Sequence, residues 1–240
     1  MFDHVTIRVS DREAAQGFYD AVLQTLGIEA TYSDSRFAEW DDFSLTLADD
    51  EDPVTRGLHI GFGAPSRDHV DRFWQAGTAA GYRDDGAPGP RPEYRDDYYG
   101  AFLLDPEGNS AEAVHHSDIR PPGRIDHLWI RVADLAAAQR FYETIAPFAG
   151  FRLQRDGERT WFVGAGGSFT LLEGKPTEHV HLAFPATENA SVDAFHRASI
   201  EAGYRDNGAP GERAHYHPGY YGAYVLDPDG NNVEVVNHNR

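Results

Sequence analysis

The chain has 240 residues, of which 40% are hydrophobic and 25% charged, and this composition predicts a globular protein of one large or two small domains. Its net charge of −18 argues against nucleic acid and anionic membranes as partners, and no apolar run reaches the roughly 18–20 residues of a membrane-spanning helix. The absence of cysteine excludes disulfides, thiolate-bound zinc and cysteine nucleophiles, and we expect a cytoplasmic location.

An internal repeat organises the sequence. Residues 1–115 align with residues 124–240 from end to end, and the segment 116–123 between them contains Arg-Pro-Pro-Gly, which is typical of a linker. We therefore predict an N-terminal domain over 1–115 and a C-terminal domain over 124–240. Each half divides again into two units of similar pattern.

The first unit begins with a half-buried strand, in which Val5, Ile7 and Val9 alternate with polar residues. Ser10 and Glu13 form a possible capping box for the helix that follows. This helix carries one apolar stripe and is expected to stop at Gly27. Short strands are predicted around 29–34, 36–41 and 43–48.

The second unit repeats the strand and helix and then differs in its loops. A strand covers Leu58–Phe62, and Ser66 can cap a helix that ends near Gly81. A stretch rich in glycine and proline, 84–92, leads to two strands that Asp-Pro-Glu-Gly joins in a tight turn. The chain then reads as βαβββ four times, with further elements predicted at 99–104, 110–115, 125–132, 135–147, 179–184, 190–202, 222–226 and 232–237.

Three polar residues recur at nearly the same spacing in both halves, with intervals of 55 and 53 residues in the first half and 54 and 53 in the second. Two neutral imidazoles and one carboxylate form a ligand set for a divalent metal, and three ligands leave positions open for water or substrate. The candidate metal ligands are His4, His59 and Glu112, followed by His127, His181 and Glu234.

Strand parity predicts where these side chains point. In the segment 125–132 the apolar residues must face the helices, so His127, Trp129 and Arg131 are expected on the opposite, concave face.

The sequences around the six candidates resemble the vicinal oxygen chelate (VOC) superfamily. The paired strings are FDHVTIRV and IDHLWIRV, LHIGF and VHLAF, and DPEGNSAEAV and DPDGNNVEVV. This superfamily includes glyoxalase I, extradiol ring-cleaving dioxygenases, fosfomycin-resistance transferases, methylmalonyl-CoA epimerase and bleomycin-type resistance proteins. The resemblance implies an α+β fold of tandem VOC domains, in which two βαβββ modules form curved mixed sheets around a cup-shaped site.

The resemblance also implies a metal cofactor, namely Fe²⁺, Mn²⁺, Ni²⁺ or Zn²⁺. It places the first-strand ligand on His4 and His127, the fifth-strand ligand on His59 and His181, and the last-strand carboxylate on Glu112 and Glu234. Glyoxalase I normally adds a glutamate on the last strand of its first module. Here that strand reads Phe-Ser-Leu-Thr-Leu in one half and Ser-Phe-Thr-Leu-Leu in the other, so the fourth ligand is missing.

An aromatic loop at 215–221 is the candidate substrate wall, and the alternative is a rigid loop that packs over the rim of the cup. His217 or Tyr224 is a candidate for proton transfer. Two arginines on the first strands could hold a substrate carboxylate or phosphate, although a structural salt bridge is the commoner role. The predicted substrate contacts are Arg8, Tyr98, Tyr99, Trp129, Arg131, His215, Tyr220 and Tyr221.

The leading hypothesis is a metal-dependent enzyme that acts on a small, oxygen-rich organic substrate. The metal would stabilise an enolate or related oxyanion, and Glu112 or Glu234 would carry the proton in glyoxalase-like lyase or isomerase chemistry. Two alternatives stay open. One is an Fe²⁺ extradiol-type dioxygenase, which the tail containing His217, Tyr224 and Glu234 partly matches. The other is a protein that sequesters a drug or metabolite without turnover, as bleomycin-resistance proteins do.

Two arrangements of the modules fit the sequence. Each half can build its own complete ligand set, or the modules can pair across the chain. In the second arrangement His4 joins His181 and Glu234, while His127 joins His59 and Glu112. The fused halves resemble a covalent version of the homodimers of single-domain relatives, so we expect a monomeric pseudo-dimer or a homodimer.

Overall fold

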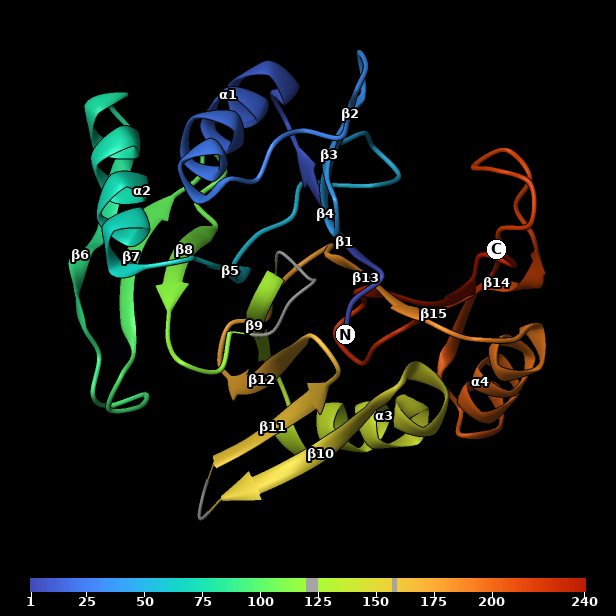
Figure 1. Ribbon diagram of the computed structural model, residues 1–240. Coiled ribbons are helices and arrows are strands. Elements are labelled where there is room, and N and C mark those ends of the chain that lie inside the picture. The colour runs from blue at the N-terminus through green and yellow to red at the C-terminus, as the bar shows by residue number, and fades with distance from the viewer. Residues whose placement is uncertain (120–124, 157–158) are drawn as a thin grey trace.

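The computed structural model describes residues 1–119, 125–156 and 159–240 (Figure 1). Residues 120–123 of the linker predicted at 116–123 therefore lie outside the described residues. The elements follow the predicted βαβββ order in four modules.

The first half contains two modules. The first consists of β1 (His4–Val9), α1 (Arg12–Leu23), the short 3₁₀ helix η1 (Gln24–Leu26), β2 (Tyr32–Ser33), β3 (Phe37–Trp40) and β4 (Phe43–Leu47). The second consists of β5 (His59–Gly63), α2 (Arg67–Ala79), β6 (Arg83–Pro90), β7 (Tyr99–Leu104) and β8 (Ser110–His115).

The second half repeats this order. The third module consists of β9 (Ile125–Val132), α3 (Leu135–Ala149), β10 (Phe151–Asp156), β11 (Arg159–Gly164) and β12 (Gly167–Glu173). The fourth consists of β13 (His181–Pro185), α4 (Asn189–Glu201), β14 (Arg205–Glu212), β15 (Tyr221–Leu226) and β16 (Asn232–Asn237).

One local prediction is wrong, and one stretch gains a strand. The N-cap of α1 is Asp11, whose side chain accepts a hydrogen bond from the Ala14 amide, whereas Ser10 donates to Glu107. The glycine- and proline-rich stretch 84–92, to which no strand was assigned from the sequence, is largely the strand β6. Its prolines are tolerated because β6 is the last strand of its sheet, where backbone N–H groups need no partner, and irregular register absorbs the misfit.

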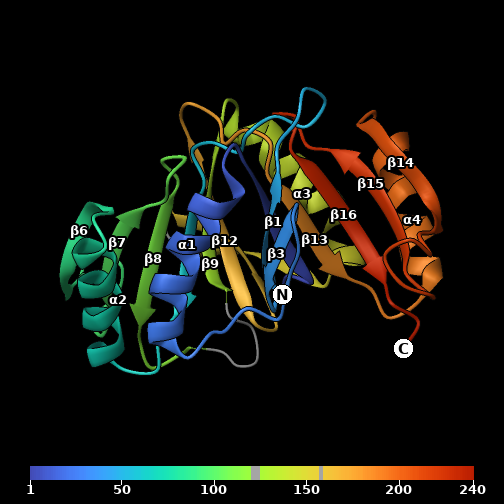
Figure 2. The same ribbon diagram turned by 90° about the horizontal axis from the view of Figure 1, so that it is seen from above.

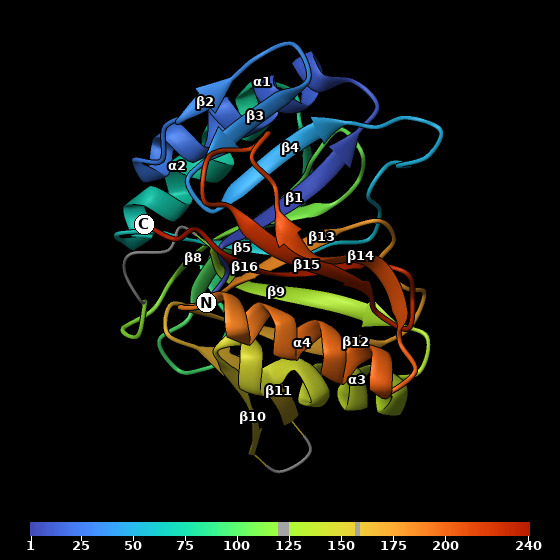
Figure 3. The ribbon, with the colours of Figure 1, turned by 90° about the vertical axis from the view of Figure 1, so that its right-hand side faces the viewer.

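The strands form two mixed sheets of eight, and each sheet takes strands from both halves of the chain. The first sheet has the order β14-β15-β16-β13-β1-β4-β3-β2, and the second has β10-β11-β12-β9-β5-β8-β7-β6. Figure 3 shows β1 beside β13 in the middle of the first sheet. The modules therefore pair across the chain, and the boundaries at 1–115 and 124–240 stay a prediction.

The apolar faces of both sheets share one continuous core. Helix α1 packs beside α2 and α3 beside α4, so each helix pair joins a module of one sheet to a module of the other (Figures 1 and 2). Phe43 of the first sheet meets Phe62 of the second with ring centroids 5.3 Å apart. The opposite face of each sheet is left free to carry polar side chains. In the described part of the chain, no helix is long and apolar enough to cross a bilayer.

The repeated D-P-x-G-N sequence has a structural role. The Asp105 carboxylate accepts the backbone N–H groups of Glu107 and Asn109 and the hydroxyl of Tyr19 from α1. Gly108 takes a left-handed conformation with φ of +85°, which glycine adopts without strain. The motif thus fixes the β7–β8 turn against the first helix, and Asp227 does the same with Tyr142 in the second half.

The cross-chain pairing predicts a disulfide between two introduced cysteines. Arg56 and Glu178 form an isolated antiparallel bridge with both backbone hydrogen bonds, at 2.9 and 3.0 Å. The Cα atoms of such a pair are about 5.5 Å apart, within the range of a disulfide. Because the chain has no cysteine, the Arg56→Cys/Glu178→Cys variant should oxidise to one intrachain link, seen as faster migration on a non-reducing gel and a mass loss of two hydrogens. Each single variant is the control, and a double variant that yields only dimers would contradict the pairing.

Candidate metal centres

Two clusters of imidazole and carboxylate groups lie on the polar faces of the sheets. Site 1 consists of His4, His181 and Glu234, and site 2 of His59, Glu112 and His127. In site 1 the His181 Nε2 atom lies 3.1 Å from His4 Nε2 and 3.1 Å from Glu234 Oε2, and His4 Nε2 lies 3.8 Å from the same oxygen. In site 2 the corresponding distances are 3.3, 3.0 and 3.3 Å. Each cluster is therefore compact enough for one ion.

Strand register brings these residues together from distant parts of the chain. His4 on β1 lies directly opposite Ala183 on β13, and Glu234 on β16 lies opposite Ala183 on the other side. His181 is two residues before Ala183 and so shares its face of the sheet. In site 2, Gly61 on β5 takes the same central position between His127 and Glu112.

Small residues make room for the carboxylates. A Cβ atom at Gly222 would lie 2.5 Å from Glu234 Oε1, and one at Gly100 would lie 2.5 Å from Glu112 Oε1. Neither glycine has a positive φ, so space for the glutamate is the reason for glycine here. A Cβ atom at Gly61 would collide with the His127 ring.

The hydrogen bonds of site 2 fix both histidines in the form that binds metal. Ser110 donates its hydroxyl proton to Asp85, 2.7 Å away, so its oxygen is left to accept the Nδ1–H of His59 at 3.2 Å. The Asp126 carboxylate accepts the Nδ1–H of His127 at 3.0 Å. Both Nε2 lone pairs therefore point toward the Glu112 carboxylate. Three lone pairs at such distances need a positive charge between them, which a divalent cation supplies.

The outer sphere of site 1 resembles that of site 2 at one histidine only. The Asp3 carboxylate accepts His4 Nδ1–H at 2.8 Å. The Asn232 amide N–H donates to His181 Nδ1 at 2.9 Å while its oxygen accepts from Asn207, so a neutral His181 carries its proton on Nε2, facing Glu234. The second Asp3 oxygen lies 2.8 Å from His238, whose ring continues to His217. The chain ends thus meet beside site 1. In site 2 the equivalent path from Asp126 leads to the buried His116, whose Nδ1 accepts the Asp118 backbone N–H in place of a second histidine.

A phenol holds each carboxylate. Tyr220 donates to Glu234 Oε1 and Tyr98 donates to Glu112 Oε1, both at 2.7 Å. Burial, together with the neighbouring glutamate, raises the pKa of both phenols above the usual value, so they remain donors. The other carboxylate oxygen, Oε2, is left to face the imidazoles.

Without an ion, site 2 holds a proton. Burial alone would raise the pKa of Glu112, but the contacts of its carboxylate with His127 Nε2 and His59 Nε2 lower it to about 2. Burial opposes the charge on His127, yet hydrogen bonds to Asp126 and Glu112 raise its pKa to about 10. Burial lowers the pKa of His59. A neutral His59, a charged His127 and an ionised Glu112 are thus expected near pH 7, and a cation must displace the proton on His127.

The other predicted site residues are divided between the clusters and the surface. Tyr224 lies across the strand pair from Glu234, and Trp129 stacks on His59 with centroids 4.5 Å apart. His217 contacts His238, and His215 is exposed and packs against Tyr216.

Four predicted substrate contacts have other partners. Tyr99 and Tyr221 donate to Asp71 on α2 and Asp193 on α4, on the helix side of their sheets. Arg8 forms an ion pair with Asp52 at 2.6 Å, and Arg131 donates to the Gly57 carbonyl.

Sequence reasoning missed the outer-sphere residues Asp3, Asp126, His116 and His238. A signal was present for the first two, because an Asp-His pair opens both halves. No comparable signal exists for the histidines, which reach the clusters only through the fold.

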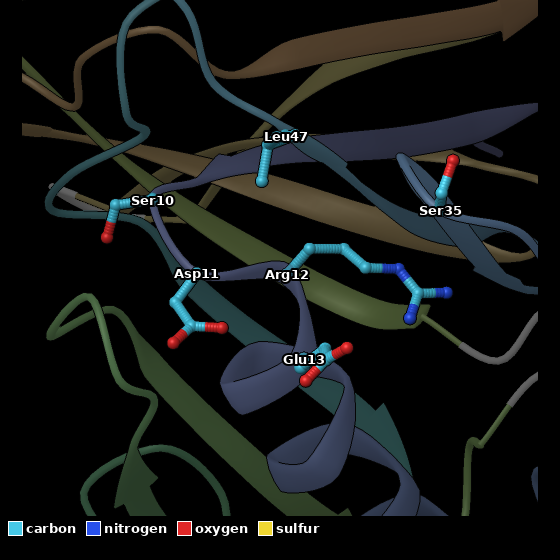
Figure 4. Close-up of a pocket in the computed structure, with 6 residues that line it drawn as sticks. All are labelled: Ser10, Asp11, Arg12, Glu13, Ser35 and Leu47. Atoms are coloured by element: carbon cyan, nitrogen blue, oxygen red, sulfur yellow. The ribbon is translucent and has the colours of Figure 1, made fainter.

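The pocket in Figure 4 belongs to neither cluster. It lies where β1 leads into α1 and is lined by Ser10, Asp11, Arg12, Glu13, Ser35 and Leu47.

Comparison with known families decides the relationship. The sequence model of the glyoxalase/bleomycin resistance protein/dioxygenase superfamily matches residues 1–113 and again 124–235. The chain belongs to this superfamily. A search of curated protein sequences gives no match.

Solved structures with the VOC fold cover nearly the whole chain. Glyoxalase I from Zea mays is 20% identical, with a TM-score of 0.68 over 99% of this chain and 92% of its own. A putative dioxygenase from Bacillus subtilis subsp. subtilis str. 168 is 12% identical, with a TM-score of 0.65 over 100% of this chain and 85% of its own. At these identities the likeness shows the shared fold, which agrees with the α+β architecture expected from the sequence.

Loss of the phenol at site 1 should weaken metal binding. The Tyr220→Phe variant removes the hydrogen bond that orients Glu234, and loss of such an outer-sphere contact costs about 10–100-fold in affinity. The matched control is Tyr221→Phe, whose hydroxyl binds Asp193 on the helix side. Calorimetric titration with Mn²⁺ measures both. Equal affinities for the two variants would contradict the role of Tyr220.

Metal binding at site 2 should release a proton and depend on pH. Because the pKa of His127 is raised to about 10, the ion competes with a proton at every pH below that value. Affinity should therefore fall about tenfold for each pH unit lowered between about pH 9 and pH 7. Calorimetric titration with Mn²⁺ in buffers of different ionisation enthalpy measures how many protons are released for each ion bound. Asp126→Asn should lower the pKa of His127 and reduce the release, and an affinity independent of pH would contradict the protonated state.

Proposed function

We propose that this protein is a divalent-metal-dependent enzyme with glyoxalase-like lyase or isomerase chemistry. Its substrate would be a small organic molecule with oxygens on adjacent carbons. The observation that carries the proposal is the convergence of two imidazole Nε2 atoms and one carboxylate oxygen, with hydrogen bonds on the far side of each ligand. Membership of the superfamily supports it.

The described residues supply three protein ligands at each cluster, which leaves coordination positions for substrate oxygens. His4, His181 and Glu234 would hold one ion, and His59, Glu112 and His127 the other. When bound, the ion would act as a Lewis acid toward the two substrate oxygens and lower the pKa of the adjacent C–H group.

The protein groups would then position the substrate and move its proton. In site 1, burial raises the pKa of Glu234, but the hydrogen bond from His181 and the nearby His4 lower it, so the carboxylate is ionised near pH 7. Displaced from the ion, it would accept a proton from a substrate carbon at Oε2, while Tyr220 fixes Oε1. Tyr224, across from Glu234, is the proposed donor to a substrate oxygen.

Proton exchange with solvent tests this function. A panel of small 2-hydroxycarbonyl compounds would be incubated in D₂O with protein reconstituted with Mn²⁺, Ni²⁺, Zn²⁺ or Fe²⁺, and deuterium incorporation followed by NMR. Metal-dependent exchange or product formation is expected. No stoichiometric metal, or no reaction with any metal, would contradict the proposal.

The same panel separates the alternatives. Oxygen uptake with catechols after anaerobic reconstitution with Fe²⁺ would indicate a dioxygenase, since lyase and isomerase chemistry consumes no oxygen. Tight binding of an aromatic compound that survives complete chelation would indicate a sequestering protein.

The variant Glu234→Gln tests the proton carrier. Glutamine keeps an oxygen for Tyr220 but removes the basic carboxylate, so turnover should fall by about 10²–10⁴-fold. Asp206→Asn on β14, whose carboxylate pairs with His196 of α4 on the helix side, is the control for loss of a carboxylate on the same sheet. Turnover and circular dichroism are measured together, and a folded Glu234→Gln variant with full turnover would contradict this assignment.

A further inference from the structure

We propose that the two centres have different roles: site 1 admits substrate to its ion, whereas site 2 holds an ion that aromatic side chains close off from substrate. This inference rests on the proposed function for the reaction at site 1, but the difference in access between the sites is a property of the fold.

The exposure of the ligands differs. The His4 and His181 side chains are 25% and 11% exposed, whereas those of His59 and His127 are 4% and 9% exposed. The glutamates are buried in both sites. Because an open coordination position needs a path from solvent, the difference on the imidazole side decides which ion a substrate can reach.

The residues beside the ligands explain the difference. On β1, Thr6 lies next to Ser44 of β4, which in turn faces Glu39 of β3. The same row in the second sheet has Trp129 next to Thr170, which faces Trp161. A hydroxyl and a carboxylate at site 1 are thus replaced by two indoles at site 2.

The strand beside the glutamate differs in the same way. Tyr224 lies across from Glu234, whereas Phe102 takes this position across from Glu112. The rim of site 1 is therefore polar, and that of site 2 is mainly aromatic.

The indole closes site 2 by direct contact. Trp129 stacks on the His59 ring at 4.5 Å with an interplanar angle of 26°. Tyr94 packs on Trp129 at 5.3 Å and on Tyr98 at 5.2 Å. This layer covers one face of the His59 ring with aromatic side chains.

Among the described residues, no indole covers site 1. Tyr216, the repeat equivalent of Tyr94, is 61% exposed, packs against His215 and Tyr220 of its own loop, and is hydrogen bonded to Tyr224. Thr6 bonds to Ser44 at 2.7 Å and leaves the space over His181 clear of an indole. The polar rim fits a small hydroxylated substrate better than an aromatic one.

Access of water to each ion tests the proposal without any substrate. The probe is Mn²⁺ alone, bound to the full chain carrying His59→Gln or His181→Gln, which are equivalent positions that leave one site intact. Electron paramagnetic resonance gives the stoichiometry, and the relaxation rate of solvent protons reports water on the ion. We expect one ion in each variant, with several-fold larger relaxation enhancement and faster exchange for the ion at site 1.

A second matched pair of variants repeats the test in case the His→Gln variants do not fold. Gly100→Ala pushes on Glu112, and Gly222→Ala pushes on Glu234, each through a Cβ atom 2.5 Å from Oε1. The same relaxation contrast should follow when either site is weakened in this way. Trp129→Thr should open site 2, raising the relaxation enhancement of its ion several-fold.

The outcomes separate this inference from the proposed function. Equal relaxation enhancement at both sites, or no ion at site 2, would overturn the division of roles. If the His181→Gln variant, which binds its ion at site 2 alone, still turned substrate over, the division of roles would be wrong as well. A clear relaxation contrast with no turnover in the parent protein would sustain the difference in access and refute the proposed function alone.

Discussion

The pairing of β1 with β13 and of β5 with β9 is the constraint on which the rest of the molecule depends. It places His4 and Glu234 on either side of Ala183, and His127 and Glu112 on either side of Gly61. A shift of one residue in either pairing would turn the ligands toward the helices and the apolar residues toward solvent. The burial of Val5, Ile60, Leu128 and Leu182 in the shared core opposes such a shift, so core packing and site geometry are fixed by the same register.

The same constraint makes burial of charge tolerable. Glu112 is fully buried and Glu234 is 1% exposed, which would be costly without partners. A phenol on one oxygen and imidazoles at the other provide these partners, and Asp3 and Asp126 hold the rings of His4 and His127 in turn. Each cluster is thus organised before a cation arrives, which reduces the reorganisation that binding requires.

Comparison of the two halves of the chain shows which residues of the metal centres are the same in both and which differ. Both copies keep the ligands, the phenol on the carboxylate and the D-P-x-G-N turn. They differ where a side chain borders the ion without holding it, as with Thr6 and Trp129 or Tyr224 and Phe102. A chain with two such centres can change access at one while the other retains its surroundings, because the shared core lies behind both sheets.

The sequence by itself determined the repeat, the order of the modules, the superfamily and the faces of the strands, because period-two alternation and turn residues are local properties. Alternation along residues 125–132 was enough to place His127 opposite the core face, and the repeated Asp-His pair was a visible sign of the outer sphere. Only the tertiary structure decided that His4 joins His181 rather than His59, since both pairings satisfy the same local pattern and differ in long-range contacts alone. It also placed His238 beside Asp3 and laid Trp129 over His59, because which side chains meet across strands depends on register and packing that no single segment encodes.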